Sequence, residues 1–225
     1  MESGHWQVEL GLWDATFQRR SGVTTDVTSA ANTVVKYGAS DTVDIEASMA
    51  LFQSVRVHDA LGEQTDSGVG DLFLRAKWNP AGGGDETFSW VIFPFVKLPT
   101  ASHGLGNGEV EAGLLVPLAY EFGDGWALAS TPEADLLLNE FGRGYHATIV
   151  DVIGLGRDIT GGFNLGMEIW ASQNFDPAGT VSQYSFGPEI AWQPNPNNQF
   201  DGGFAVGLNR QTPDLELYAG FSRRF

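Results

Sequence analysis

An alternation of apolar and polar residues, with a period of two, dominates this chain. Residues 43–57, 110–122 and 163–172 each carry apolar side chains at nearly every second position, with polar or small side chains between them. Because successive side chains of a strand point to opposite faces, each segment is predicted to be a strand with one apolar face. No segment shows a convincing helical period. The alternation slips only at 145–156, which is the weakest of the predicted strands.

Turn-forming residues divide these strands at regular intervals. Short connectors are predicted at 38–41, 79–86, 123–125, 157–160 and 194–198. Longer connectors alternate with them, at 18–30, 58–68, 99–108, 139–144, 173–179 and 210–214. Outer-membrane barrels have this sidedness, with short periplasmic turns and longer extracellular loops. The pattern therefore predicts an all-β fold, an antiparallel up-and-down transmembrane β-barrel of about 12 strands that spans residues 1–225 as a single domain.

Aromatic residues favour a membrane barrel over a soluble β-sandwich, which would also alternate. Trp78, Trp126 and Trp192 stand next to short connectors on the apolar parity, where a membrane-interface girdle is expected. The outward face of a soluble sandwich is usually rich in Lys and Thr, whereas the polar parity here carries acids and many glycines. We therefore place the barrel in the bacterial outer membrane, in contact with membrane lipid and lipopolysaccharide.

Composition and charge exclude several classes of protein. The formal net charge is −16, from 28 acidic against 12 basic residues, whereas nucleic-acid binding requires clustered Lys and Arg. The chain has no cysteine, which excludes disulfides and thiolate metal sites. No apolar run is long enough for a transmembrane helix. Residues 1–20 lack a signal-peptide pattern, so we expect that a leader has been removed from this chain.

Three segments resemble one known family. Residues 67–78, 93–108 and 111–122 are similar to the meta-pathway phenol-degradation (MetA-pathway) family of outer-membrane β-barrel transporters. The resemblance is carried by Gly68-x-Gly70-Asp71 and by Lys97-Leu98-Pro99-Thr100, although Ala101 stands where glycine is expected. It implies a twelve-stranded barrel and the uptake of small hydrophobic or aromatic compounds.

The polar parity of the strands is predicted to line the lumen. The charged residues expected to face inward are Asp71, Arg75, Lys77, Lys97, Glu109, Glu111, Glu133, Asp135, Glu168 and Glu189. Hairpin pairing about 99–108 and 123–125 gathers Lys97, Glu109, Glu111, Glu133 and Asp135 into a charge cluster in the outer half of the lumen. Asp71, Arg75 and Lys77 are assigned to the inner half, and Phe73, Phe93, Phe95 and Trp170 also face inward.

Two interpretations of these lumen charges remain open. They form a ladder that fills and satisfies the barrel interior, or they form a constriction that selects cations or polar solutes, because rings of carboxylates favour positive charge. The inward aromatic residues are compatible with a path for hydrophobic solutes and equally with a plug.

Catalytic constellations are weak in this sequence. The candidates for a lipid-hydrolysing barrel are His146 with Thr148, and Ser102 and His103 with Asn107, but no serine accompanies His146 and nothing fixes the loop group. The four histidines lack metal-ligand spacing, so neither a metal nor another cofactor is expected. We expect a channel or facilitator for a small-molecule solute, not an enzyme. The alternatives are an outer-membrane lipid hydrolase and a structural or adhesion barrel with a plugged lumen.

The last strand is predicted at 215–225 and must pair with the first to leave no open edge. Gly220, Phe221 and Phe225 resemble the terminal signal by which outer-membrane proteins are recognised by their assembly machinery. We expect the folded barrel to be a monomer.

Overall fold

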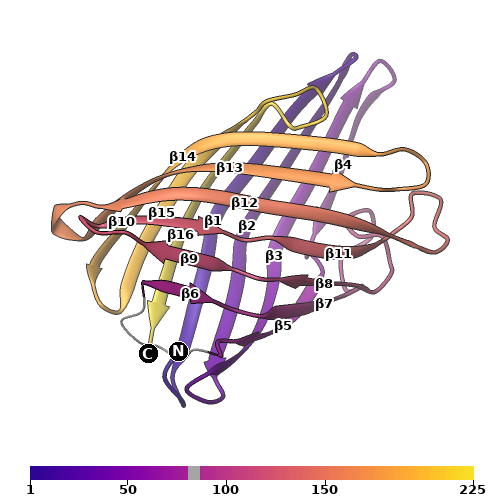
Figure 1. The fold of residues 1–225 in the computed structure, drawn as a ribbon. Coiled ribbons are helices and arrows are strands. Elements are labelled where there is room, and N and C mark those ends of the chain that lie inside the picture. Colours follow the sequence, from indigo (N-terminus) through magenta and orange to yellow (C-terminus); the bar gives the residue numbers. More distant parts are fainter. Residues whose placement is uncertain (81–86) are drawn as a thin grey trace.

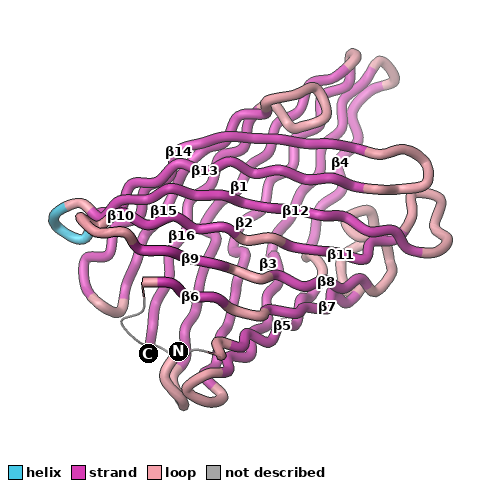
Figure 2. Tube along the Cα trace, viewed as in Figure 1, coloured by secondary structure: helices cyan, strands magenta, loops and turns pink. Residues whose placement is uncertain are grey.

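The computed structural model describes residues 1–80 and 87–225, which form one closed antiparallel β-barrel (Figures 1 and 2). The elements are β1 (Trp6–Arg20), β2 (Val23–Gly38), β3 (Val43–Asp59), β4 (Gly62–Gly68), β5 (Leu72–Trp78), β6 (Phe88–Trp90), β7 (Phe93–Leu98), β8 (Glu111–Leu115), β9 (Leu118–Glu121), β10 (Trp126–Ser130), β11 (Glu133–Leu138), β12 (Tyr145–Asp158), the 3₁₀ turn η1 (Thr160–Gly162), β13 (Phe163–Asn174), β14 (Val181–Asn195), β15 (Asn198–Gly207) and β16 (Leu215–Arg224). No helix in the described part of the chain is long and apolar enough to cross a membrane. Most of the connector predicted at 79–86 lies outside the described residues.

The 16 segments form a barrel of 12 strands, because four of the strands are each interrupted once. The interrupted strands are β4–β5, β6–β7, β8–β9 and β10–β11. The barrel closes where β1 pairs with both β2 and β16, so that Leu10 lies between Thr33 and Phe221. The predicted antiparallel barrel of about 12 strands is confirmed. β12 runs without interruption through 145–156, where the sequence pattern was weakest.

The interruptions in three neighbouring strands lie side by side. Pro117 separates β8 from β9, and Pro132 separates β10 from β11, because proline has no N–H to donate to a ladder. Backbone bonds nevertheless cross the gaps, from Val91 N to Pro117 O at 2.9 Å and from Val116 N to Pro132 O at 2.9 Å. The wall is therefore continuous at these interruptions.

Two predicted long connectors are wrong. Residues 18–30 form the ends of β1 and β2 and a two-residue turn at Ser21 and Gly22, whose φ angles of 51° and 83° suit a tight hairpin. Residues 58–68 likewise consist of strand with a two-residue turn, because β3 ends at Asp59 and β4 begins at Gly62. Both hairpins project beyond the rest of the barrel (Figure 1). Both segments stay paired along their length, and 18–30 contains the β-branched residues Val23, Thr24, Thr25, Val27 and Thr28 that favour a strand.

The distribution of side chains is inverted relative to that of a soluble protein. Among the described residues, Ala15 and Val91 are the buried apolar residues. Buried polar residues are more numerous: Ser29, Asp44, Glu46, Lys97, His146, Thr148, Ser172 and Thr212. Large apolar side chains cover the outside, for example Ile169 and Phe204 with exposed fractions of 49% and 44%. An apolar outer face around a polar interior is the arrangement of a transmembrane barrel.

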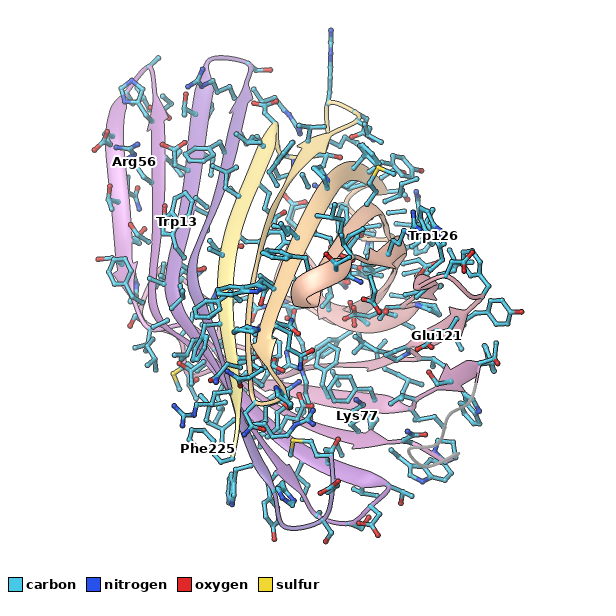
Figure 3. The ribbon with its side chains drawn as sticks, turned by 90° about the vertical axis from the view of Figure 1, so that its left-hand side faces the viewer. Trp13, Arg56, Lys77, Glu121, Trp126 and Phe225 are labelled. Carbon is cyan, nitrogen blue, oxygen red and sulfur yellow. The ribbon has the colours of Figure 1, made fainter. Side chains whose placement is uncertain are left out.

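Aromatic rings stack beside the short connectors, at the end of the barrel where both termini lie in Figure 1. Trp192 stacks between Phe163 and Phe200, with ring centroids 5.8 Å from each. Trp78 is 47% exposed, and Trp126 lies at the outer surface in Figure 3. The three tryptophans thus share one level of the barrel, and their role as a membrane-interface girdle stays a prediction.

The last strand seals the barrel against the first. Phe225 N donates to Trp6 O at 2.8 Å, and Trp6 N donates to Phe225 O at 3.4 Å. Phe221 lies on the outer face, whereas Gly220 faces the lumen beside the carboxylate of Asp201. The role of Gly220, Phe221 and Phe225 in assembly stays a prediction.

Candidate functional site: a lumen with two different walls

Glycines on the lumen face make room for long side chains from the next strand. A Cβ at Gly203 would lie 2.7 Å from the Tyr218 hydroxyl oxygen, and one at Gly166 would meet the Glu189 carboxylate. Gly113 leaves the same space for Asp135. The charged and aromatic lumen side chains therefore lie flat against the wall.

Four side chains form a compact ionic network in the outer half of the lumen, which we call the outer cluster: Asp71, Lys97, Asn107 and Glu111. Lys97 Nζ lies 2.8 Å from Glu111 and 3.4 Å from Asp71, and it donates to Asn107 Oδ1 at 2.7 Å. Asn107 Nδ2 in turn donates to Glu111 Oε1 at 2.6 Å. The side chains of Asp71, Lys97 and Glu111 are only 9–11% exposed, so the charge of Lys97 is enclosed by its partners.

The outer cluster also fastens the loop formed by residues 99–110. Ala101 N donates to Asp71 Oδ1 at 2.8 Å, and Leu138 N donates to Glu111 Oε1 at 2.8 Å. Ser102 Oγ accepts a bond from Val69 N at 3.1 Å, so this serine has a structural role in the loop. Charge neutralisation and loop anchoring are therefore achieved by the same residues.

The predicted hairpin registers are confirmed. Lys97 lies opposite Glu111, Glu133 lies opposite Leu115, and Asp135 lies opposite Gly113. Glu133 and Asp135 nevertheless interact with each other, and Glu133 interacts with Arg75 rather than with Lys97. Among the described residues, neither of these two carboxylates makes an ion pair with Lys97, so the predicted five-residue cluster is divided into two parts.

Two other predicted positions are wrong. Asp71 was assigned to the inner half, but it precedes β5 at the outer end of the barrel and contacts Lys97. Glu109 was assigned to the cluster, but β8 begins only at Glu111, so Glu109 remains in the loop with its side chain exposed. The described part of the structure contains no ion pair for Glu109.

The inner half of the same wall contains Arg75 and Lys77, as predicted. The Arg75 guanidinium donates to Ser48 Oγ and lies 4.9 Å from the centroid of the Phe73 ring. The Phe95 ring lies beside that of Phe73, and its centroid is 6.0 Å from the guanidinium. In the register, Lys77 lies opposite Asp44. The aromatic side chains here support a cation and do not form a bare hydrophobic path.

Sequence reasoning missed an ion-pair chain beside these residues. Lys36 Nζ lies 2.7 Å from Glu9 and 3.6 Å from Glu46, which is 4% exposed. Pairing β2 with β3 about the connector at 38–41 places Lys36 opposite Glu46. The contact between Lys36 and Glu46 could have been predicted from the alternation pattern together with this hairpin register. Lys36 and Lys97 of this wall therefore each have two carboxylate partners.

The opposite wall has a different character. Five carboxylates face the lumen from β1 and from β13 to β16, and we call them the acidic wall: Asp14, Glu168, Glu189, Asp201 and Glu216. None of them makes an ion pair with a described residue, and they interact mainly with one another, as Glu168 does with Glu189. A cavity of about 350 Å³ lies against this wall, and Trp170 and Tyr218 also line it. Sequence reasoning placed Glu168 and Glu189 inward but did not assemble the wall, because its members come from distant strands.

His146 belongs to a latch between two outer loops. Its Nδ1 lies 3.2 Å from Asp176 Oδ2 and 3.0 Å from Asn139 Oδ1. Asp176 also accepts bonds from Glu140 N at 2.8 Å and from Ala178 N at 2.7 Å. Loops 139–144 and 175–180 therefore meet at one carboxylate. Among residues 1–80 and 87–225, no group of histidines and acids is arranged to hold a metal ion.

We expect the loop latch to weaken in acid. Backbone donation from Ala178 and Glu140, with a smaller contribution from His146, lowers the pKa of Asp176 below its ordinary value of 3.8. A lowered carboxyl pKa contributes stability above the ordinary value and loses it as pH falls through the lowered value. Hydrogen exchange, corrected for intrinsic rates, should therefore show that protection of the Glu140 and Ala178 amides declines at acidic pH. In Asp176→Asn, protection should be low at every pH. Equal protection in the two proteins at neutral pH would contradict the latch.

Comparisons with known proteins agree with this architecture. A family model with the description "Putative MetA-pathway of phenol degradation" matches residues 2–225. The chain belongs to this family. The family model covers almost the whole chain, so the resemblance seen in three segments of this MetA-pathway barrel is confirmed. No curated protein matches the chain.

Solved structures similar to this MetA-pathway barrel are outer-membrane barrels. The COG4313 outer-membrane channel from Pseudomonas putida F1 has a TM-score of 0.77 at 15% identity, with 100% of this chain and 96% of that chain covered. The β domain of the Bordetella autotransporter BrkA has a TM-score of 0.62 at 14% identity, with full coverage of both chains. The NanC porin has a TM-score of 0.60 at 7% identity, with 96% and 98% covered. The fold and the inverted side-chain distribution show that the protein is an outer-membrane barrel.

Proposed function

We propose that this barrel is a passive outer-membrane channel for small molecules. The observation that carries the proposal is the lumen itself, which combines a polar, charged lining with a cavity of about 350 Å³ inside one closed chain. The structurally similar protein from Pseudomonas putida F1 is named an outer-membrane channel, and NanC is named a porin. The name of the family supports small aromatic compounds as solutes.

Selection in such a channel depends on lumen width and charge, without a cofactor or a covalent step. The acidic wall favours cations, because its carboxylates lack ion-pair partners among the described residues. In the outer cluster, Lys97 offsets part of the negative charge of Asp71 and Glu111 near the outer mouth. Each chain encloses its own lumen, so we propose that a monomer is sufficient for transport.

A non-enzymatic role is part of this proposal. Ser102 accepts a backbone bond from Val69, and the Nδ1 atom of His146 faces Asp176 and Asn139. Neither arrangement brings a serine hydroxyl to a histidine, which a lipid hydrolase of the serine type requires. This geometry supports transport over hydrolysis.

The channel is tested by reconstituting the folded chain in planar bilayers and in solute-loaded liposomes. We expect a steady, cation-selective conductance and permeation of small aromatic compounds in preference to sugars. Heat-denatured protein is the control for leakage. Absence of both conductance and permeation would overturn the channel and favour a structural or adhesion barrel. Release of fatty acid from phospholipid by the folded protein would instead indicate a hydrolase.

A further inference from the structure

The cavity against the acidic wall is large enough to hold a small solute. Its volume of about 350 Å³ lies within the range of small-molecule sites. Its chemistry-bearing side chains are the carboxylates of Glu168, Glu189 and Glu216 and the rings of Trp170 and Tyr218. They come from β13, β14 and β16, so the site exists only in the closed barrel.

The loop formed by residues 208–214 covers the outer end of this cavity. Thr212 and Pro213 line it, and Thr212 is only 4% exposed. Tyr184 N donates to Thr212 Oγ1 at 2.8 Å, and Gln183 Nε2 donates to Gln211 O at 2.6 Å. The loop is thus fixed to β14, which gives the cavity a defined roof.

Close contacts require glycine at two positions of this wall. A Cβ at Gly187 would collide with the carbonyl oxygen of Phe204, and a Cβ at Gly203 would lie 2.7 Å from both Pro188 O and Tyr218 Oη. Larger residues therefore cannot occupy these wall positions without displacing backbone or the tyrosine ring. Tyr218 Oη lies 3.5 Å from Glu189 Oε2 and donates to it, so the ring and the carboxylate are positioned together.

The charge of this cavity is not compensated by the described protein. None of its three carboxylates forms an ion pair with a described residue, and they repel one another, as Glu168 and Glu189 do. Two cations of the opposite wall are already engaged, Lys97 with Asp71 and Glu111 and Lys36 with Glu9 and Glu46. Partly desolvated carboxylates without a partner are costly, and a bound positive charge offsets that cost.

We propose that this cavity binds an organic cation, an ammonium group carried on a small apolar or aromatic body. The proposal rests on the proposed channel function and names the class of solute that the channel selects. The carboxylates neutralise the ammonium group, while the faces of Trp170 and Tyr218 attract the cation and contact its apolar body. A neutral aromatic compound leaves the carboxylates uncompensated, an inorganic cation makes little use of the rings, and an anion is repelled.

The site is tested by block of the potassium current through the whole chain in planar bilayers. Phenyltrimethylammonium is the probe, with benzyl alcohol as the neutral comparison and benzenesulfonate as the anionic one. We expect phenyltrimethylammonium to reduce the current in a concentration-dependent way and the other two to have no effect at the same concentrations. No block, or equal block by all three compounds, would overturn the proposal.

Two variants locate the site. Glu189→Gln and Trp170→Leu should each raise the half-blocking concentration about fivefold, because each removes an interaction of about 1 kcal/mol with the cation. Glu121→Gln is the matched control, because Glu121 carries a carboxylate on the lumen parity of β9, outside the cavity lining. Unchanged block in the two site variants, or an equal loss in Glu121→Gln, would show that no such site acts.

Binding to the detergent-folded chain separates this proposal from the channel function. Titration calorimetry should show heat from phenyltrimethylammonium and none from benzenesulfonate, with weaker binding to Glu189→Gln. If the protein binds the probe but conducts no current, the channel proposal fails and the cation site stands. If it conducts but neither binds nor is blocked, the cation site fails alone.

Discussion

Lys97→Ala should make the channel markedly more selective for cations. Lys97 is enclosed by Asp71, Glu111 and Asn107, so its removal leaves two lumen carboxylates without their counter-charge. A unit charge about 4 Å from a permeating ion contributes about 1 kcal/mol in water, which corresponds to about a fivefold change in relative permeability. The reversal potential in a salt gradient across a planar bilayer measures this change.

Lys97→Arg is the matched control, because it keeps the positive charge while changing the shape of the side chain. We expect its selectivity to stay close to that of the original protein. Should Lys97→Ala leave the reversal potential unchanged, ions do not pass near the outer cluster, and the network serves only to hold the loop formed by residues 99–110. An equal change in both variants would point to loop displacement rather than charge.

Ile169→Arg should strongly destabilise the folded barrel in lipid. Ile169 is 49% exposed on the outer face and lies midway along β13. An arginine facing lipid at the middle of the bilayer costs about 2–4 kcal/mol. Urea-induced unfolding in lipid vesicles, followed by tryptophan fluorescence, measures the free energy of unfolding.

Glu168→Arg is the neighbouring control on the same strand. Its side chain faces the lumen beside Glu189, so the arginine gains carboxylate partners and avoids the lipid. We expect a much smaller change in the free energy of unfolding, accompanied by weaker cation selectivity. A larger destabilisation in Glu168→Arg than in Ile169→Arg would reverse the assignment of the two faces.

The strands could be predicted from the sequence because residues that face the bilayer are apolar, residues that face the lumen are polar or small, and the two alternate along each strand. The register that pairs Lys97 with Glu111 followed from one hairpin, in which partners are close in the chain. Asp71 and Glu109 were misplaced because their positions depend on where β5 and β8 begin, and alternation defines strand ends poorly. The hairpins turning at residues 21–22 and 60–61 were misread as long loops for the same reason.

The acidic wall could not be assembled from the sequence alone. Glu168 and Glu216 belong to strands that are not neighbours in the barrel, and no local pattern states that their side chains share one cavity. The Asp176 latch was missed as well, because it joins a loop to the backbone of another loop.

The sequence by itself determined the membrane barrel, its strand number and which parity faces lipid, because these follow from a repeated two-residue period. Only the tertiary structure decided which charges of distant segments meet. It divided the lumen into a wall where Lys36 and Lys97 have carboxylate partners and an acidic wall whose carboxylates have no ion-pair partner among the described residues, because the fold brings together side chains separated by tens of residues.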